Sequence, residues 1–134
     1  MDTMIDTSVW IDFFNGANNA HVLSLEHLLQ TGNACICPVV LMEVLQGIRT
    51  DKQYRQTERL MSSLTCFTIP EAYYKDSAKL YRDLRKQGVT IRKSIDCLIA
   101  VTAINNGLPI LHRDRDFSAI EKHSGLVCTV VKEH

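Results

Sequence analysis

Short apolar runs alternate along this chain with longer segments whose apolar residues recur at helical spacing. This alternation constrains the fold most, because strands separated by helices usually join as parallel strands of one sheet. The expected strands cover residues 3–6, 34–37, 65–69, 108–112 and 126–131. The expected helices cover residues 20–30, 38–48, 51–64, 70–87 and 92–106, with a loop or short helix at 113–123. The sequence therefore predicts an α/β fold with a mainly parallel central sheet.

The chain shows no internal repeat, low-complexity tract or linker, and its 134 residues correspond to about one domain. We therefore expect a single domain over residues 1–134. No apolar run approaches the roughly 20 residues of a membrane span. The N-terminus also lacks the basic and apolar regions of a secretion signal. We expect a cytoplasmic protein with no membrane partner.

The five cysteines are odd in number, and most of them lie within apolar runs. That pattern argues against a disulfide framework. Cys35 and Cys37 are two residues apart, which is not the CxxC spacing of zinc knuckles. We expect reduced, mostly buried thiols, because free cysteine packs as a small hydrophobic side chain.

A net charge of zero conceals an uneven distribution along the chain. Residues 1–48 contain five acids and no lysine or arginine, whereas residues 49–93 contain eleven bases and five acids. Such a division suggests a bipolar surface, with one pole able to hold a cation and the other a polyanion. The alternative is that the charged side chains simply lie on exposed helix faces, where water solvates them.

Four acidic residues fall near one edge of the expected sheet. Asp6 ends the first strand, Asp114 follows strand 108–112, Glu43 lies in the helix after strand 34–37, and Asp96 lies in the first turns of the helix from residue 92. In open α/β sheets the ligand crevice lies outside the carboxyl ends of the strands. We therefore expect the four carboxylates to converge on one crevice.

Each acid also has an ordinary structural explanation. Asp6 is a plausible N-cap of a following short helix, and Asp114 and Asp116 are plausible members of a solvated turn. Glu43 and Asp96 are harder to explain in this way. Glu43 interrupts an apolar run, and Asp96 precedes a helix that is apolar nearly all round. Burial of a lone carboxylate is costly, so both acids call for a partner.

Converging carboxylates repel one another, by roughly 4 kcal/mol for a pair about 4 Å apart at an effective dielectric near 20. Protonation or a divalent cation relieves that repulsion. A site built only from carboxylate oxygens suits Mg²⁺ or Mn²⁺. Such an ion activates water and stabilises charge on a phosphoryl oxygen, so hydrolysis of a phosphodiester is the natural chemistry.

A basic helix face precedes the acidic helix start. Lys75, Lys79, Arg82 and Lys86 recur at i, i+4, i+7 and i+11, which places them on one face of a helix. Arg92 and Lys93 continue the positive charge towards Asp96. A polyanionic substrate fits this charge, with Lys79, Arg82, Lys86, Arg92 and Lys93 as candidate contacts. A solvated amphipathic surface is the alternative.

Four motifs together resemble the PIN-domain ribonucleases, and in particular the VapC-type toxins of type II toxin–antitoxin systems. The motifs are I5-D-T-S-V-W-I-D12, P38-V-V-L-M-E-V-L-Q-G47, R92-K-S-I-D-C-L-I-A100 and I110-L-H-R-D-R-D-F117. Each motif is weak alone, but the set spans nearly the whole chain in the order and spacing of the family. The resemblance implies a three-layer α/β/α domain.

The resemblance also implies a Mg²⁺- or Mn²⁺-dependent endoribonuclease that cuts RNA by metal-activated water. The family's acidic quartet falls on Asp6, Glu43, Asp96 and Asp114, of which Asp6, Asp96 and Asp114 are expected to bind metal. Asp116 matches a second acid of the last motif, and Thr7 or Ser8 matches a supporting hydroxyl. The implied partners are an RNA substrate, a cognate antitoxin protein and a second copy of the chain.

Other functions leave different signatures. A haloacid-dehalogenase-type phosphatase needs Asp-x-Asp after the first strand, but Ser8 stands where the second Asp would be. A phosphoacceptor receiver domain needs an acidic pair at that place. A PIN-like module that binds RNA or a partner without cutting it remains the main alternative. Trp10, Phe13 and Phe14 belong either to the core or to a groove for the antitoxin.

Overall fold

The computed structural model describes residues 1–131 as seven helices around four strands. The strands are β1 (Thr3–Ile5), β2 (Ala34–Ile36), β3 (Thr65–Cys66) and β4 (Ile110–Leu111). The helices are α1 (Thr7–Phe14), α2 (Ala20–Thr31), α3 (Pro38–Gln46), α4 (Asp51–Ser62), α5 (Glu71–Lys86), α6 (Ser94–Asn105) and α7 (Arg115–His123). Strands thus alternate with helices, as the sequence predicts.

The four strands form one sheet in the order β3-β2-β1-β4. All three strand pairs are parallel, with Met4 aligned with Cys35 on one side and with Ile110 on the other. The prediction of a mainly parallel sheet is therefore confirmed. Because the strands are parallel, their carboxyl ends meet at one edge of the sheet.

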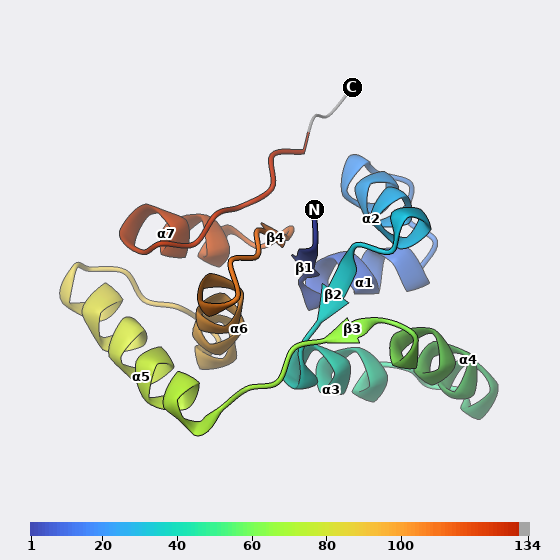
Figure 1. Ribbon diagram of the computed structural model, residues 1–134, viewed down its shortest axis with the longest axis horizontal. Helices are drawn as coiled ribbons and strands as arrows, with labels where there is room; N and C mark the ends of the chain where they lie inside the picture. The colour runs from blue at the N-terminus through green and yellow to red at the C-terminus, as the bar shows by residue number, and fades with distance from the viewer. Residues whose placement is uncertain (132–134) are drawn as a thin grey trace.

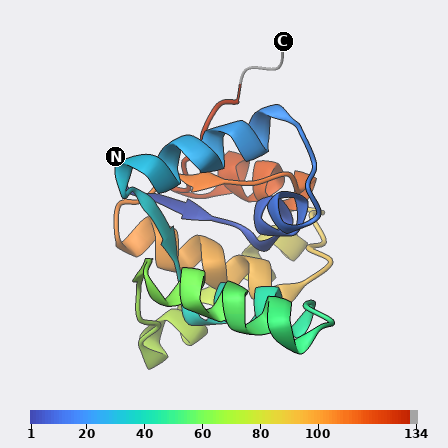
Figure 2. The same ribbon diagram turned by 90° about the vertical axis from the view of Figure 1, so that its right-hand side faces the viewer.

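Helices cover both faces of the sheet, which gives the expected three layers. Figure 1 shows α1 and α2 on one side of the strands, and α6 backed by α5 on the other. Figure 2 shows β1 lying between α2 and α6 in the perpendicular view. Helix α6 is buried on all sides along its middle, since every residue from Asp96 to Ala103 is buried. A helix buried all round explains why its sequence carries almost no polar face.

Two elements differ from the expected set. Helix α1 was considered only as the short helix that Asp6 would cap, and Asp6 is its N-cap in the structure. The strand expected at 126–131 is wrong, because only one isolated bridge joins Cys128 to Ile110. Two backbone hydrogen bonds make this bridge: Ile110 N–H donates to the carbonyl oxygen of Val127 at 2.9 Å, and Thr129 N–H donates to the carbonyl oxygen of Ile110 at 2.8 Å. The N–H of Cys128 between them donates to Glu121 Oε2 at 2.7 Å.

Side-chain burial settles two smaller points. Cys35, Cys37 and Cys97 are buried free thiols, as expected, whereas Cys66 is exposed. Trp10 is fully buried and stacks on Phe14 with ring centroids 6.0 Å apart. Trp10 therefore belongs to the core, whereas Phe13 and Phe14 are partly buried against it, and Phe14 also lines a groove with Val44 and Ile48. Within residues 1–131, no helix is both long and apolar enough to cross a membrane.

Candidate active site

Asp6 lies at the carboxyl end of β1 and begins α1. Its Oδ2 accepts hydrogen bonds from the backbone N–H of Ser8 at 3.0 Å and from Ser8 Oγ at 2.6 Å. The residue is 4% exposed. Both hydrogen bonds end on Oδ2. Asp6 can therefore cap α1 with one carboxylate oxygen and still present the other at the edge of the sheet.

Asp96 is the most deeply buried acid of the expected quartet, at 1% exposure in the first turn of α6. Its Oδ2 has no solvent contact and no hydrogen-bond partner among the described residues. Burial is the main cause that raises the pKa of Asp96 to about 7; the positive charge of Lys93 opposes the rise, and the negative charges of Asp6, Asp114 and Glu43 add to it. Asp6, Asp114 and Glu43 therefore lie near enough to Asp96 for their charges to act on it, but of the expected quartet only Asp96 and Asp114 belong to the close carboxylate cluster described next.

Asp114 and Asp116 bring two further carboxylates to Asp96 at the start of α7. Asp114 Oδ1 accepts the backbone N–H of Asp116 at 2.9 Å, so Asp114 is the N-cap of α7. Carboxylate oxygens of Asp96, Asp114 and Asp116 lie within 4.8 Å of one another. Asp116 is thus more central than its assignment as a supporting acid implied.

Glu43 lies on α3, and a hydrogen bond from α1 fixes its side chain. Its Oε1 accepts a hydrogen bond from Thr7 Oγ1 at 2.8 Å. The two hydroxyls that the sequence left as alternatives therefore have separate tasks: Thr7 orients Glu43, and Ser8 orients Asp6. Ser8 Oγ also accepts the backbone N–H of Arg113 at 3.0 Å, which ties the segment after β4 to α1.

His112 and Asp12 also support this segment. His112 Nδ1 accepts the backbone N–H of Asp114 at 3.1 Å, which requires the neutral imidazole. Burial lowers the pKa of His112 and so favours that neutral form. Asp12 forms an ion pair with Arg113, the neighbour of Asp114. Neither residue has a role that could be assigned from the sequence.

Arg92 differs most from its sequence-based assignment. The sequence places it among the substrate contacts, but its guanidinium pairs with Asp114 at 2.8 Å and with Asp116 at 3.1 Å. Lys93 is exposed, and its charge lowers the pKa of Asp96. The basic dipeptide therefore lies beside the acids. The position of Arg92 and Lys93 immediately before the helix that carries Asp96 was the feature of the sequence that indicated this proximity.

The remaining candidate substrate contacts lie on the exposed face of α5. Lys79, Arg82 and Lys86 are exposed on α5, and no ion pair within residues 1–131 joins them to the acidic cluster. Arg82 lines a groove of about 580 Å³ between α5 and α6. Ser94 and Ile95 line the same groove, so the basic face of α5 borders the start of the helix that carries Asp96.

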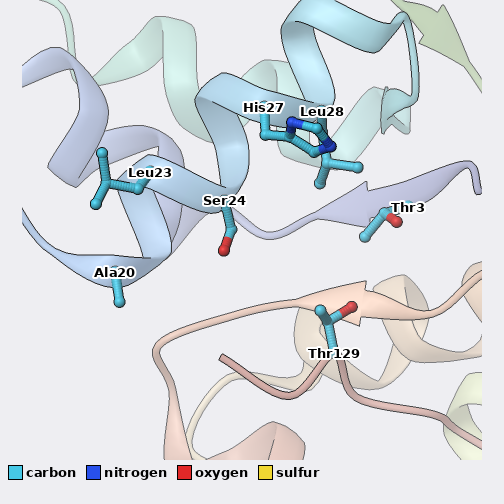
Figure 3. A pocket seen from close by; sticks show the side chains of 7 residues that line it. All are labelled: Thr3, Ala20, Leu23, Ser24, His27, Leu28 and Thr129. Atoms are coloured by element: carbon cyan, nitrogen blue, oxygen red, sulfur yellow. The ribbon is translucent and has the colours of Figure 1, made fainter. Parts of the chain in front are cut away.

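The cavity in Figure 3 is separate from the acidic cluster. It has a volume of about 450 Å³, and Figure 3 shows Leu28 and Thr3 on one side and Thr129 on the other. Thr3 begins β1, whereas Asp6 follows its end. The cavity therefore opens at the opposite end of that strand and does not belong to the acid site.

Comparisons with known proteins agree with this architecture. A family model described as the PIN domain matches residues 3–123. Ribonuclease VapC11 of Mycobacterium tuberculosis is 33% identical over 126 residues, covering 92% of this chain and 94% of that protein. Ribonuclease VapC1 of Methanocaldococcus jannaschii is 28% identical over 123 residues, covering 92% of this chain and 83% of the relative.

Solved structures show the same fold at lower identity. VapBC2 from Rickettsia felis, bound to a DNA fragment from its promoter, matches with a TM-score of 0.77 at 21% identity. The match covers 96% of this chain and 98% of that chain. VapBC-1 from nontypeable Haemophilus influenzae matches with a TM-score of 0.72 at 21% identity, over 96% and 97% of the two chains. The three-layer prediction is thereby confirmed.

Proposed function

This chain belongs to the PIN-domain family, and from that premise we propose that it is a metal-dependent endoribonuclease, the toxin component of a toxin–antitoxin pair. The relatives named VapC ribonucleases support the activity. The solved VapBC structures support the pairing with an antitoxin. A single domain over residues 1–134, acting in the cytoplasm, is part of the same proposal.

The observation that carries the proposal is the buried, unpartnered Oδ2 of Asp96 beside further carboxylates. A buried carboxylate oxygen without a partner among the described residues is costly. A cation placed among Asp96, Asp114 and Asp116 would satisfy it, because the oxygens of all three lie within 4.8 Å. The donors are oxygens only, which fits Mg²⁺ or Mn²⁺ better than a softer metal.

The residues proposed to hold the ion are Asp6, Asp96 and Asp114, with Asp116 adjoining them. Glu43 completes the catalytic quartet as a direct ligand or through a water molecule. A divalent cation bound there supplies an activated water and neutralises negative charge on the phosphoryl group. No side chain of this chain is required as a nucleophile, and the 2′-hydroxyl of the RNA takes no part.

The chain's own contribution is to fix the acids before substrate arrives. Ser8 holds Asp6, Thr7 holds Glu43, and the first turn of α7 holds Asp114. Reactions that depend on geometry gain from such pre-organisation, because a displacement of about 1 Å can cost a hundredfold in rate. These hydrogen bonds therefore serve catalysis more than stability.

The proposed substrate path follows the basic residues. Lys79, Arg82 and Lys86 on α5 are proposed to hold RNA phosphates away from the cleavage point, and Lys93 those next to it. Phosphate contacts of this kind give affinity without sequence preference and weaken as salt rises. Homodimerisation is proposed from the family resemblance alone, and sedimentation of the purified protein tests it.

The experiment that tests the proposed activity compares RNA cleavage with Mg²⁺ or Mn²⁺ and with EDTA. We expect cleavage with metal, none with EDTA, and none for Asp96→Asn under either condition. Circular dichroism and thermal unfolding serve as controls that the variant folds. Binding of RNA without any cleavage in the presence of metal would contradict the proposal and favour a non-cutting PIN-like module.

A further inference from the structure

Arg92 supplies three hydrogen bonds to the acids proposed to adjoin the metal. Its terminal Nη2 donates to Asp114 Oδ1 at 2.8 Å, and its Nε donates to Asp116 Oδ2 at 3.1 Å. Its backbone N–H donates to the same Asp116 oxygen at 3.2 Å. A single guanidinium therefore bridges two of the three carboxylates in the acidic cluster.

Arg92 is much more exposed to solvent than the two acids with which it pairs. The Arg92 side chain is 56% exposed, whereas the side chains of Asp114 and Asp116 are 12% and 9% exposed. The cation thus covers the two acids from the solvent side. The third acid, Asp96, receives no hydrogen bond at its Oδ2 among the described residues, so the arginine neutralises only part of the cluster.

From these contacts we propose that the Arg92 guanidinium is an internal cation that competes with the divalent metal ion for Asp114 and Asp116. The proposal rests on the metal-dependent function above and assigns a role to a residue of that site. Arg92 would be a positioning residue: it holds the two carboxylates together in the metal-free protein and yields them when the ion binds.

Competition follows from the shared atoms and from charge. Arg92 and an ion held by Asp96 and Asp114 would both draw on the negative charge of Asp114, and Arg92 already donates to its Oδ1. A guanidinium and a divalent ion at adjoining carboxylates repel each other, and that repulsion is strong where the acids exclude water. Binding of the metal ion therefore weakens the ion pairs of Arg92, and those ion pairs weaken the binding of the metal ion.

The exchange needs only a side-chain movement. The guanidinium lies on the solvent side, so it can leave without opening the core. The backbone N–H bond from Arg92 to Asp116 does not involve the guanidinium and keeps this acid anchored. Release of Arg92 would also place a free guanidinium beside the site, where an RNA phosphate is its natural partner.

Lys93 provides a matched control. It carries the same charge, adjoins Arg92, and affects Asp96 through its charge. No ion pair joins it to an acid within residues 1–131. Removal of Lys93 therefore measures the general effect of one positive charge, and removal of Arg92 measures that effect together with the loss of the contact.

The test is Mn²⁺ binding by isothermal titration calorimetry to the full chain, stripped of metal with EDTA and dialysed. We expect Arg92→Ala to bind Mn²⁺ more tightly than wild type by at least about tenfold, the scale of a charge-assisted hydrogen-bonded pair. Lys93→Ala should tighten binding much less. Arg92→Lys, which keeps the charge and loses the fork, should fall between wild type and Arg92→Ala.

Thermal unfolding gives a second readout if Arg92→Ala folds poorly at 25 °C. Without the guanidinium the acids repel unopposed, so Mn²⁺ should raise the melting temperature of Arg92→Ala more than that of wild type. Equal or weaker Mn²⁺ binding by Arg92→Ala, or equal tightening by Lys93→Ala, would overturn the inference. Wild type that binds Mn²⁺ and cuts RNA under that result leaves the proposed function standing. Wild type that does neither refutes both.

Discussion

Individual acids in this site have more than one physical task. Asp6 caps α1 with the same oxygen that Ser8 supports, and Asp114 caps α7 while it pairs with Arg92. Asp96 is the exception, since its Oδ2 makes no hydrogen bond to the described residues. An acid that the fold buries without a partner is a candidate functional group. The proposed metal site therefore centres on Asp96.

The raised pKa of Asp96 predicts how stability depends on pH in the metal-free protein. Burial raises that pKa from 3.8 to about 7, so between these values the folded state binds a proton that the unfolded state releases. The contribution of Asp96 to the free energy of unfolding is therefore greatest below about pH 4, and it is lost as pH rises through about 7. At about 1.4 kcal/mol for each pKa unit, the loss is on the order of a few kcal/mol.

Urea unfolding in EDTA at several pH values measures this effect. We expect wild type to lose stability relative to Asp96→Asn as pH rises from about 4 to about 7, because the variant has no carboxyl to ionise. The comparison of the two proteins removes the contributions of all other groups. Parallel stability curves for wild type and variant would show that Asp96 titrates normally.

At the scale of elements, the sequence predicted most of the fold correctly. The alternation of apolar runs located β1, β2 and α2 to within about two residues, because period and turn residues are local signals. Helix α1 was left as an alternative because its eight residues are too few to show a helical period, and its main signal was the capping residue Asp6. The strand at 126–131 was wrong because pairing depends on partners far along the chain, and this segment meets β4 only in the single bridge that Val127 and Thr129 make with Ile110.

The contact between α1 and α3 provides a prediction at this scale. Thr7→Val removes the hydroxyl that holds Glu43 and keeps the shape of the side chain. We expect RNA cleavage to fall by about tenfold to a hundredfold, because Glu43 loses its fixed position. The free energy of unfolding should fall by only about 1 kcal/mol, the usual net worth of one hydrogen bond.

Thr102→Val is the matched control for this prediction. Thr102 is also buried, but its hydroxyl donates to the carbonyl oxygen of Leu98 within α6 and not to an acid of the site. We expect a comparable change in stability with cleavage close to that of wild type. An equal loss of cleavage in both variants would mean that Thr7 acts only through stability.

At the scale of the molecule, the parallel sheet explains why distant acids meet. Asp6 and Asp114 follow neighbouring parallel strands β1 and β4, so the order of strands places them at one edge. The sequence predicted this convergence from topology alone. It missed the pairing of Arg92 with Asp114 and Asp116 because an ion pair between residues 22 and 24 positions apart leaves no local pattern.

The division of charge along the chain also has a structural meaning. The acid-rich N-terminal third supplies Asp6 and Glu43, and the basic middle supplies the exposed face of α5 and the Arg92–Lys93 dipeptide. The proposed cation site and the proposed RNA-binding face therefore adjoin across the start of α6. That arrangement suits hydrolysis of a nucleic acid, since both metal and phosphates are held near one place.

The chemistry of the cut RNA ends tests the central claim most directly. Purified protein is incubated with total RNA and Mn²⁺, and the new ends are ligated and sequenced with and without phosphatase or kinase treatment. We expect 5′-phosphate and 3′-hydroxyl ends from wild type and no new ends from Asp96→Asn. Ends carrying a 2′,3′-cyclic phosphate, or the same cuts by Asp96→Asn, would contradict metal-dependent hydrolysis at the acidic cluster.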